Sequence, residues 1–277
     1  MSHSVISHHL HGLQLQLGLK LVRTQGRGIE LTPEGVAFQR AITRSLDIIA
    51  QATADLSRTR RSVKLSCTPG LANRLLLPRL PELQACLPGI EIVFTPTLNR
   101  PALSKSEADV EIAYLDQLPL DPNIAAELLV RPRVFPVVSP AFLERSPEAH
   151  QIDALARLAL LHEDTTARWQ QWLEAAQAGS LGPLRGIRLS HADLAIEAAR
   201  LGHGLALADD VLVARELAAG ELIEPVATDI RLGAYYFITA SSRRHDRHIL
   251  MLREWLHRAL GATASSCSGG HRGMRKS

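Results

Sequence analysis

Residues 4–33 constrain the fold of this chain more than any other stretch. Apolar side chains recur there three or four positions apart, at Ile6, Leu10, Leu13 and Leu17. This period predicts an amphipathic helix, and Gly18 is expected to end it. Residues 20–31 then predict a short hairpin with its turn at 25–28. A helix followed by a hairpin is the second half of a winged helix-turn-helix.

A long helix is predicted from Pro33 to about Arg58, with Thr32 as its N-cap. Its apolar residues follow alternating four- and three-residue steps, at Phe38, Ile42, Ile49, Ala52 and Leu56. Such a narrow seam is typical of a coiled coil and favours pairing with a second copy of the chain. The alternative is a helix packed on its own domain. The basic stretch 57–61 predicts a domain boundary.

From residue 62 onward, strands and helices alternate, which predicts a parallel sheet with helices on its faces. Strands are expected at 63–67, 90–95, 110–114, 124–130, 134–138, 159–162, 188–190, 205–208, 222–225 and 234–239. Helices are expected at 71–87, 101–107, 140–144, 152–157, 169–178, 191–201, 211–217 and 246–260. Gly261 is expected to cap the last helix, and the small, polar and basic tail 262–277 to be disordered.

The composition bounds the class of protein. The 277 residues, 46% of them hydrophobic, are enough for more than one domain, and the net charge of +3 gives no global basic field. Three cysteines without metal spacing indicate free thiols in a reducing cytoplasm. No apolar run is long enough to span a membrane, and no signal peptide is evident. The chain is therefore predicted to be cytoplasmic.

Catalysis, a cofactor and a metal are not predicted. The chain has no Gly-x-Ser-x-Gly, His-Glu-x-x-His, phosphate-binding loop or dinucleotide fingerprint. His162, Glu163 and Asp164 are consecutive, so we interpret them as a polar strand end. His8 and His11 lie one helical turn apart, but no carboxylate or thiol nearby would complete a zinc site.

An ordered set of short motifs over about residues 2–258 resembles the LysR-type transcriptional regulators, in particular the subfamily with the glycine-cleavage and β-lactamase regulators. At the N-terminal end these are Ser2 to Ser7, Leu13-Gln14, Leu17-Gly18, Gly26-Arg27, Leu31-Thr32 and Gly35. Further along they are Leu77-Pro78-Arg79-Leu80, Ala108 to Ile112, Val138-Ser139-Pro140, Trp169 to Leu173, Ala198 to Leu207, Leu217 to Leu222 and Trp255-Leu256.

The chain departs from the family pattern in three places. The family has two helices before the recognition helix, whereas this chain opens inside the turn, so we expect either a start codon assigned too late or an N-terminally truncated form. Gln14 stands where the family has glutamate. Where the family has an arginine on the wing, this chain has Thr24. Its arginine, Arg23, lies one position earlier, so the expected phosphate contact is shifted.

The resemblance implies an α/β fold: a partial winged helix-turn-helix plus linker helix, then a two-lobed periplasmic-binding-protein-like effector domain. The expected parts are the partial winged helix at 1–32, the linker and dimerisation helix at 33–61, the effector domain at 62–261 and the tail. Lobe I is expected at about 62–135 and 231–261, and lobe II at about 136–230. Crossings between lobes are expected near 134–138 and 227–232.

The implied function is that of a DNA-binding regulator controlled by a small-molecule effector bound between the lobes and acting as a dimer or tetramer. The alternative is a stand-alone small-molecule binding protein with a vestigial DNA-binding end. Promoter DNA, a small molecule and a second copy of the chain are therefore the expected partners. A recognition helix needs scaffold helices to cover its apolar face, so DNA binding by this form is in question.

Site residues follow from the resemblance position by position. The expected DNA contacts are His3, Ser4, Ser7, His8, Arg23 and Arg27. The expected effector contacts are Cys67, Thr68, Pro69, Thr97, Asn99, Tyr114, Ser139, Ser190 and His191. Strand ends and helix starts suit ligand contacts in two-lobed folds, but the same residue types also suit ordinary turns and caps. Cys67 also suits a buried apolar position.

Overall fold

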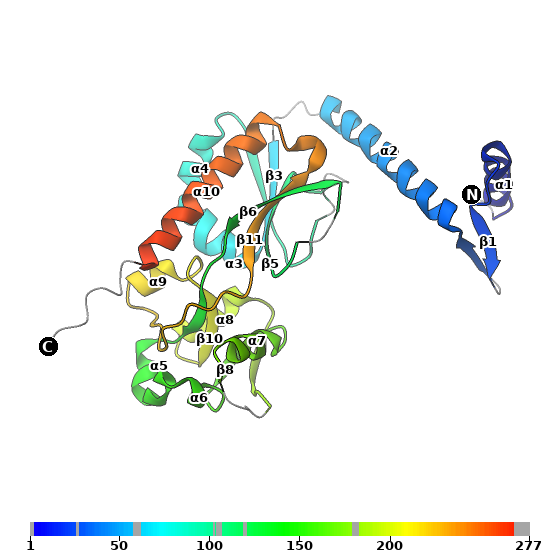
Figure 1. The fold of residues 1–277 in the computed structure, drawn as a ribbon. Coiled ribbons are helices and arrows are strands. Elements are labelled where there is room, and N and C mark those ends of the chain that lie inside the picture. The colour runs from blue at the N-terminus through cyan, green and yellow to red at the C-terminus, as the bar shows by residue number, and fades with distance from the viewer. Residues whose placement is uncertain are drawn as a thin grey trace. The chain divides into compact units, whose positions relative to one another are not determined.

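The computed structural model in Figure 1 describes residues 3–25, 28–57, 62–101, 103, 107–118, 121–178 and 183–268. The chain divides into two compact units, residues 1–59 and 60–277, and each is described by itself.

The first unit contains the helix, hairpin and long helix that the sequence predicts. These are α1 (His3–Leu17), β1 (Val22–Gln25), β2 (Gly28–Leu31) and α2 (Pro33–Ser57). The two strands pair antiparallel, and Gly18 ends α1 with a φ of +66°, which glycine adopts without strain. The Gln14 side chain ties α1 to the hairpin, because its Oε1 accepts hydrogen bonds from Leu21 N (2.8 Å) and Val22 N (3.2 Å).

The junction between the hairpin and α2 is tightly packed. Thr32 caps α2 as predicted, since its Oγ1 accepts a hydrogen bond from Gly35 N at 3.0 Å and donates one to Lys20 O at 2.6 Å. A Cβ on Gly35 would lie 1.9 Å from Leu21 O, so only glycine fits there. Thr32 and Gly35, two of the positions at which the chain resembles the family, therefore have local structural roles.

The second unit contains two sheets, one in each lobe (Figure 1). The lobe I sheet has the order β4-β3-β5-β11-β6: β4 (Glu91–Pro96), β3 (Ser62–Cys67), β5 (Val110–Leu115), β11 (Ala234–Ala240) and β6 (Ile124–Val130). The lobe II sheet has the order β7-β10-β8-β9: β7 (Val134–Val137), β10 (Leu205–Asp209), β8 (Leu160–Glu163) and β9 (Gly186–Leu189).

The parallel pairing predicted for the first strands is confirmed for β3, β4 and β5, and antiparallel strands make both sheets mixed. Strand β3 pairs parallel with β4 and β5, but β11 is antiparallel to β5 and β6, and β7 is antiparallel to β10. The chain crosses from lobe I to lobe II between β6 and β7 and returns before β11. The crossing segments run side by side, since Val134 N donates to Ile230 O at 2.7 Å. The strands that follow the two crossings, β7 and β11, are therefore antiparallel to their neighbours.

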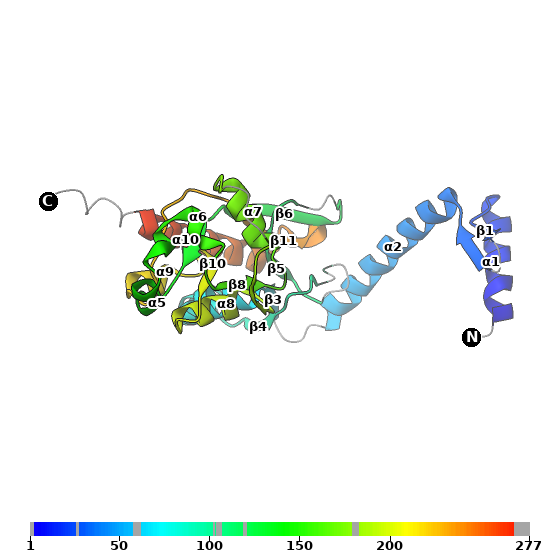
Figure 2. The same cartoon turned by 90° about the horizontal axis from the view of Figure 1, so that it is seen from below.

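Helices cover the sheets of both lobes, and apart from α10 they are short. In lobe I they are α3 (Pro69–Leu71), η1 (Ala72–Leu76), η2 (Leu77–Arg79), α4 (Leu80–Cys86), η5 (Ser241–Arg243) and α10 (Arg247–Ser268). In lobe II they are α5 (Pro140–Arg145), η4 (Pro147–His150), α6 (Ile152–Leu155), α7 (Ala167–Ala175), α8 (Ala192–Arg200) and α9 (Ala214–Ala218). Helix α10 packs against β6 and α4. Figure 1 shows α10 beside α4, and Figure 2 shows the same unit from below.

Three predicted elements differ from the structure. The helix expected at 71–87 is a π-helical turn, a 3₁₀ turn and a short α-helix, because Pro78 and Pro81 lack the N–H groups that a regular helix needs. Residues 222–225 form only one isolated bridge, between Val138 and Ile223. Helix α10 continues past Gly261 to Ser268, since Gly261 does not adopt a positive φ. The predicted helix at 101–107 falls largely outside the described residues.

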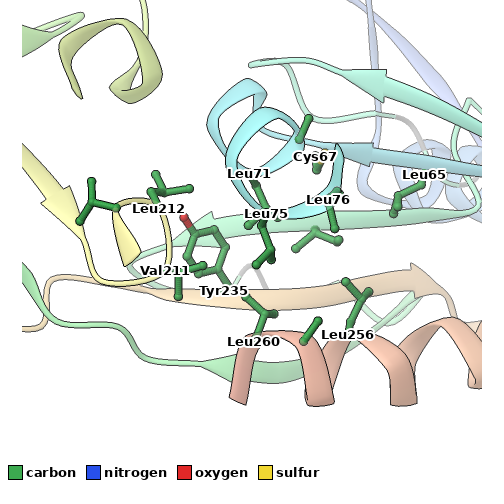
Figure 3. Packing of buried hydrophobic residues seen from close by; sticks show 14 of the residues in the cluster. Leu65, Cys67, Leu71, Leu75, Leu76, Val211, Leu212, Tyr235, Leu256 and Leu260 are labelled. Atoms are coloured by element: carbon green, nitrogen blue, oxygen red, sulfur yellow. The ribbon is translucent and has the colours of Figure 1, made fainter. Parts of the chain in front are cut away.

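One apolar core joins the two lobes. It contains Leu71, Leu75 and Leu76 from the helix after β3 and Leu256 and Leu260 from α10, together with Ala195, Ile196, Val211 and Leu212 from lobe II. Figure 3 shows Leu71, Leu75, Val211, Leu212 and Tyr235 gathered in this region. A second cluster inside lobe II is built on Trp169 and Trp172. No helix among the described residues is both long and apolar enough to cross a membrane.

Candidate ligand-binding cleft

A cavity of about 230 Å³ lies where strand ends of both lobes meet. Lobe I lines it with Thr68, Pro69, Gly70, Leu98, Tyr114 and Tyr235. Lobe II lines it with Glu163, Asp164, Arg168, Ser190, His191, Ala192, Asp209 and Leu212. Carboxyl ends of parallel strands are the usual ligand sites of open α/β sheets.

Two tyrosines are among the residues that line the lobe I side of this interlobe cavity. The rings of Tyr114 on β5 and Tyr235 on β11 meet edge to face with their centroids 5.0 Å apart. Burial raises the pKa of Tyr114 to about 12, so its hydroxyl stays protonated at neutral pH. The side is therefore aromatic but carries a hydrogen-bonding group.

Arg168 at the start of α7 reaches from lobe II to lobe I. Its guanidinium carbon lies 4.6 Å from the centroid of the Tyr114 ring, and Nη1 lies 3.6 Å from Asp116 Oδ1. Burial acts to lower the pKa of Arg168, but Tyr114 and Glu163 raise it more, and the net pKa is above the ordinary arginine value. Arg168 therefore stays charged and links the lobes at one edge of the cavity.

Asp209 at the end of β10 is a buried carboxyl at the base of the cavity. Its Oδ1 accepts from Val211 N (3.1 Å) and Leu212 N (3.0 Å), and its Oδ2 accepts from the Tyr235 hydroxyl (2.8 Å). Burial raises its pKa to about 7, although the hydrogen bond from Tyr235 acts in the opposite direction. This interlobe hydrogen bond therefore joins β11 to β10 through a group that titrates near neutral pH.

Three polar groups at the cavity could each take a further interaction partner: the Glu163 carboxylate, the Tyr114 hydroxyl and the His191 ring. Burial raises the pKa of Glu163, while Arg168 and His191 partly offset the rise. No described basic side chain lies within 4.0 Å of the Glu163 carboxylate as an ion pair. Nδ1 of His191 is buried and has no hydrogen-bond partner in the described part of the chain, and the buried hydroxyl of Tyr114 has none of normal geometry there, although the nearby Arg168 acts to lower its pKa. Buried polar atoms of this kind call for an explanation, and a ligand supplies one.

A brace of charged side chains holds the lobes together beside the cavity. Arg74 on η1 is 9% exposed and contacts Asp193 Oδ1 at 2.5 Å and Glu216 Oε1 at 2.8 Å. Asn73 Nδ2 donates to Asp193 Oδ2 at 2.8 Å. Because Asp193 is in the first turn of α8, this brace fixes the helix end that borders the cavity.

A second cavity of about 110 Å³ adjoins the first, and Thr68, Leu98 and Tyr114 line both. Cys67, Thr97 and Asn99 border only this smaller space. Cys67 is 2% exposed and belongs to the apolar core, and burial raises its pKa to about 12. It therefore behaves as a small apolar residue, which was the alternative interpretation from the sequence.

Five of the expected effector residues come together in the interlobe cavity: Thr68, Pro69, Tyr114, Ser190 and His191. Ser139 does not join them. It is the N-cap of α5, where its hydroxyl accepts from Phe142 N at 3.2 Å, and it borders neither cavity.

Sequence reasoning missed Glu163, Asp164, Arg168, Asp209 and Tyr235. The rule that ligands lie at strand ends would have found three of them, because Glu163 and Asp209 end β8 and β10 and Asp164 follows β8. Residues 162–164 lie at the end of β8, which ends at Glu163, in agreement with the polar strand end expected from the sequence. His162 is buried and hydrogen-bonds Arg185 O, whereas Glu163 and Asp164 line the same cavity.

The expected DNA contacts lie on α1 and the hairpin. His3 and Ser4 are in the first turn of α1, Ser7 and His8 are exposed further along it, and Arg27 lies outside the described residues. Arg23 on β1 is exposed, and its guanidinium pairs with Glu30 on β2 at 2.9 Å. Among the described residues, no group of three or more His, Cys, Asp or Glu side chains is placed to hold a metal ion.

Comparison with known proteins gives concordant results. A family model described as "LysR substrate binding domain" matches residues 57–261. The chain is 27% identical over 260 residues to the glycine cleavage system transcriptional activator of Escherichia coli K12, covering 92% of this chain and 84% of that protein. It is 30% identical over 275 residues to the regulator TrpI of Pseudomonas aeruginosa, covering 94% and 89%.

Solved structures agree with these relatives. The effector domain of the regulator AmpR of Pseudomonas aeruginosa superposes with a TM-score of 0.64 at 26% identity, covering 76% of this chain and all of that one. The regulator CrgA of Neisseria meningitidis shares the fold over 95% of this chain and 90% of its own, with a TM-score of 0.60 at 20% identity. The chain belongs to the LysR-type transcriptional regulators and is a regulator rather than an enzyme.

Proposed function

We propose that this chain controls transcription by binding promoter DNA through α1 and its hairpin, in response to a small molecule held between the two lobes. The observation that carries the proposal is the interlobe cavity, whose buried Tyr114 hydroxyl and His191 Nδ1 have no hydrogen-bond partner of normal geometry in the described part of the chain. Both lobes supply these groups. A ligand that hydrogen-bonds them would therefore affect how the lobes pack on each other.

The ligand is expected to act through small shifts rather than through wide opening. Leu75 and Leu76 of lobe I share one buried cluster with Ala195 and Val211 of lobe II. Separating the lobes would expose these side chains, at about 1.5–3 kcal/mol for each large one. Small shifts at the Arg168 end of α7 and the His191 end of α8, which border the cavity, do not require this cluster to separate, although Ala195 and Ile196 of α8 belong to it.

Exposed polar residues on α1 support the DNA-binding part of the proposal. Ser7 and His8 are exposed, and both side chains suit contacts to phosphates or base edges. Arg23 suits a phosphate contact, although its ion pair with Glu30 would compete with one.

Self-association through α2 and through the second unit is part of the same proposal. Along α2, Ile42 is 44% exposed, Leu46 59% and Ile49 61%. A second copy of the helix would cover this apolar face. Replacing Leu46 by glutamate should then shift the protein toward the monomer in sedimentation velocity, whereas Gln39→Glu, an exposed polar position on the same helix, should not.

The DNA part is tested by mobility shift of the full chain on promoter fragments at several salt concentrations. The expected result is a complex whose logarithmic affinity falls linearly with the logarithm of salt concentration. Arg23→Gln should reduce that slope by about one phosphate contact, and Arg215→Gln, an exposed arginine of α9, should leave it unchanged.

A second candidate function is small-molecule binding without DNA binding. The exposed apolar side chains of α1 favour it, since Ile6 is 51% exposed, Leu15 71% and Leu17 40%. A recognition helix needs these faces covered. A chain that binds a small molecule, but shows no salt-dependent DNA complex at any salt concentration, would establish this second candidate.

A cytoplasmic location of the chain stays a prediction.

A further inference from the structure

The interlobe cavity has more negative than positive side chains. Glu163, Asp164 and Asp209 line it, and Arg168 is its one lining arginine or lysine among the described residues. The guanidinium of Arg168 already has interaction partners, because it pairs with Asp116 at 3.6 Å and lies over the Tyr114 ring. A purely anionic ligand would therefore meet a compensated cation and an excess of carboxylates.

Glu163 is the carboxylate that most needs a partner. It lies at the end of β8, borders the cavity and is only partly accessible to solvent. It forms no ion pair within 4.0 Å with a described side chain. Burial disfavours its charged form and raises its pKa. Asp164 follows it at the exposed edge of the same cavity. A cationic group entering between them would stabilise both carboxylates.

A different kind of group borders the cavity at the start of α8. Ser190, His191 and Ala192 line it there, and no side chain caps the nine-residue helix. The Nδ1 atom of His191 is buried without a partner. Uncapped N–H groups of a helix start, together with the Ser190 hydroxyl, suit an anionic or strongly polar acceptor.

We propose that the ligand of this cavity is a small zwitterion of the α-amino acid type, with its ammonium group at Glu163 and Asp164 and its carboxylate at Ser190, His191 and the first turn of α8. Both charged ends of the ligand bind to lobe II, and the Tyr114 hydroxyl of lobe I completes the site. The cavity of about 230 Å³ limits the ligand to a compact molecule. This inference rests on the proposed function and specifies the chemical class of its effector.

The test is calorimetric titration and thermal unfolding of the full chain with common L- and D-α-amino acids. Each is compared with its N-acetyl derivative, which lacks the ammonium group, and with its amide, which lacks the carboxylate. The expected result is that a free amino acid binds and that both derivatives lose affinity. Glu163→Gln should weaken binding of the free amino acid about tenfold to a hundredfold, the effect of losing a hydrogen bond to a charged group.

Glu144→Gln is the matched control, because Glu144 is an exposed carboxylate on α5 of the same lobe and borders neither cavity. It should leave binding unchanged, and circular dichroism should show that both variants fold. Binding of N-acetyl derivatives as tight as that of free amino acids overturns the inference, as does the absence of binding by every free amino acid. An anionic or neutral metabolite that binds with Tyr114-dependent affinity would leave the proposed function standing. Failure of the proposed function would show instead as DNA binding that no small molecule changes.

Discussion

The boundary between the two lobes has an apolar part and a polar part, and the two differ in packing and in hydrogen bonding. One part is apolar and closed: Leu75 and Leu76 are fully buried in a cluster that contains residues of both lobes (Figure 3). The other part is the cavity, where carboxylates, tyrosines and Arg168 meet with polar atoms left unpaired. The apolar part supplies stability, whereas the polar part gives up stability for groups that a ligand can satisfy.

This difference locates where the molecule can respond. Tight packing makes a shift inside the apolar cluster costly, while the cavity contains space and titratable side chains. A ligand signal should therefore change the start of α7, the start of α8 and the ends of β8 and β10 more than it changes the helix that follows β3. Mutations in the apolar part should therefore mainly change stability, whereas mutations at the cavity should mainly change the response to the ligand.

The largest effect is expected at the apolar part. Leu75→Ala removes a side chain with 0% exposure and should lower the free energy of unfolding by about 2–5 kcal/mol, measured by urea denaturation. Leu77→Ala, two residues away and 50% exposed, should change it by about 0.5 kcal/mol or less. Equal losses in the two variants would mean that the buried cluster does not dominate this boundary.

The charged brace should rank second. Arg74→Met leaves the carboxylates of Asp193 and Glu216, which are 16% and 17% exposed, without their cation. We expect a loss of about 2–3 kcal/mol in the same assay, because unpaired carboxylates with little solvent access repel each other. Arg215→Gln on α9 is the exposed control. If Arg74→Met is as stable as the parent chain, the brace does not hold the lobes together.

Asp209 should give the molecule a pH dependence. Its pKa in the folded chain is about 7, above the ordinary value of 3.8, so the folded chain binds more protons than the unfolded chain between these values. The stability from this group is therefore full below about pH 4 and falls as pH rises toward 7. We expect a loss of about 2 kcal/mol between about pH 5 and 7.

Asp209→Asn should flatten that part of the pH profile, measured by thermal unfolding in buffers of matched ionic strength. The exposed Asp229, whose side chain is 74% accessible, provides the control Asp229→Asn, which should keep the profile of the parent chain. A profile unchanged by Asp209→Asn would assign the dependence to other groups.

The smallest effect on stability is expected at Glu163. Glu163→Gln removes a carboxylate that burial disfavours and should raise the free energy of unfolding at neutral pH by about 0.5–1 kcal/mol, while ligand affinity falls. Opposite signs for stability and binding would distinguish a ligand contact from a structural residue. A loss of stability in the ligand-free variant would contradict this assignment.

Most elements of the fold could be predicted from the sequence because their signals are local. Buried strands such as β5, β10 and β11 are continuous apolar runs, and Thr32 with Pro33 marks a helix start that the structure confirms. The interruption of the helix after β3 was also visible in Pro78 and Pro81, but a regular apolar period obscured it. The strand directions in the mixed sheets depend on the two lobe crossings, which periodicity does not encode.

The candidate site was only partly predictable. Thr68, Ser190 and His191 follow strand ends, so a general rule of open sheets finds them. Arg168 lies in the first turn of a helix, and its role depends on Tyr114 and Asp116, which are more than fifty residues away in sequence. Such pairings are tertiary. Ser139 has the right local setting, at a helix start, but on a helix that does not border the cavity.

The most direct test of the account is hydrogen–deuterium exchange of the full chain with and without the α-amino acid that raises its melting temperature most. We predict slower exchange at the end of β8, the start of α7 and the first turn of α8, with exchange of the apolar helix after β3 unchanged. Protection confined to other segments, or no protection by any amino acid of the series, would contradict a ligand site between the lobes.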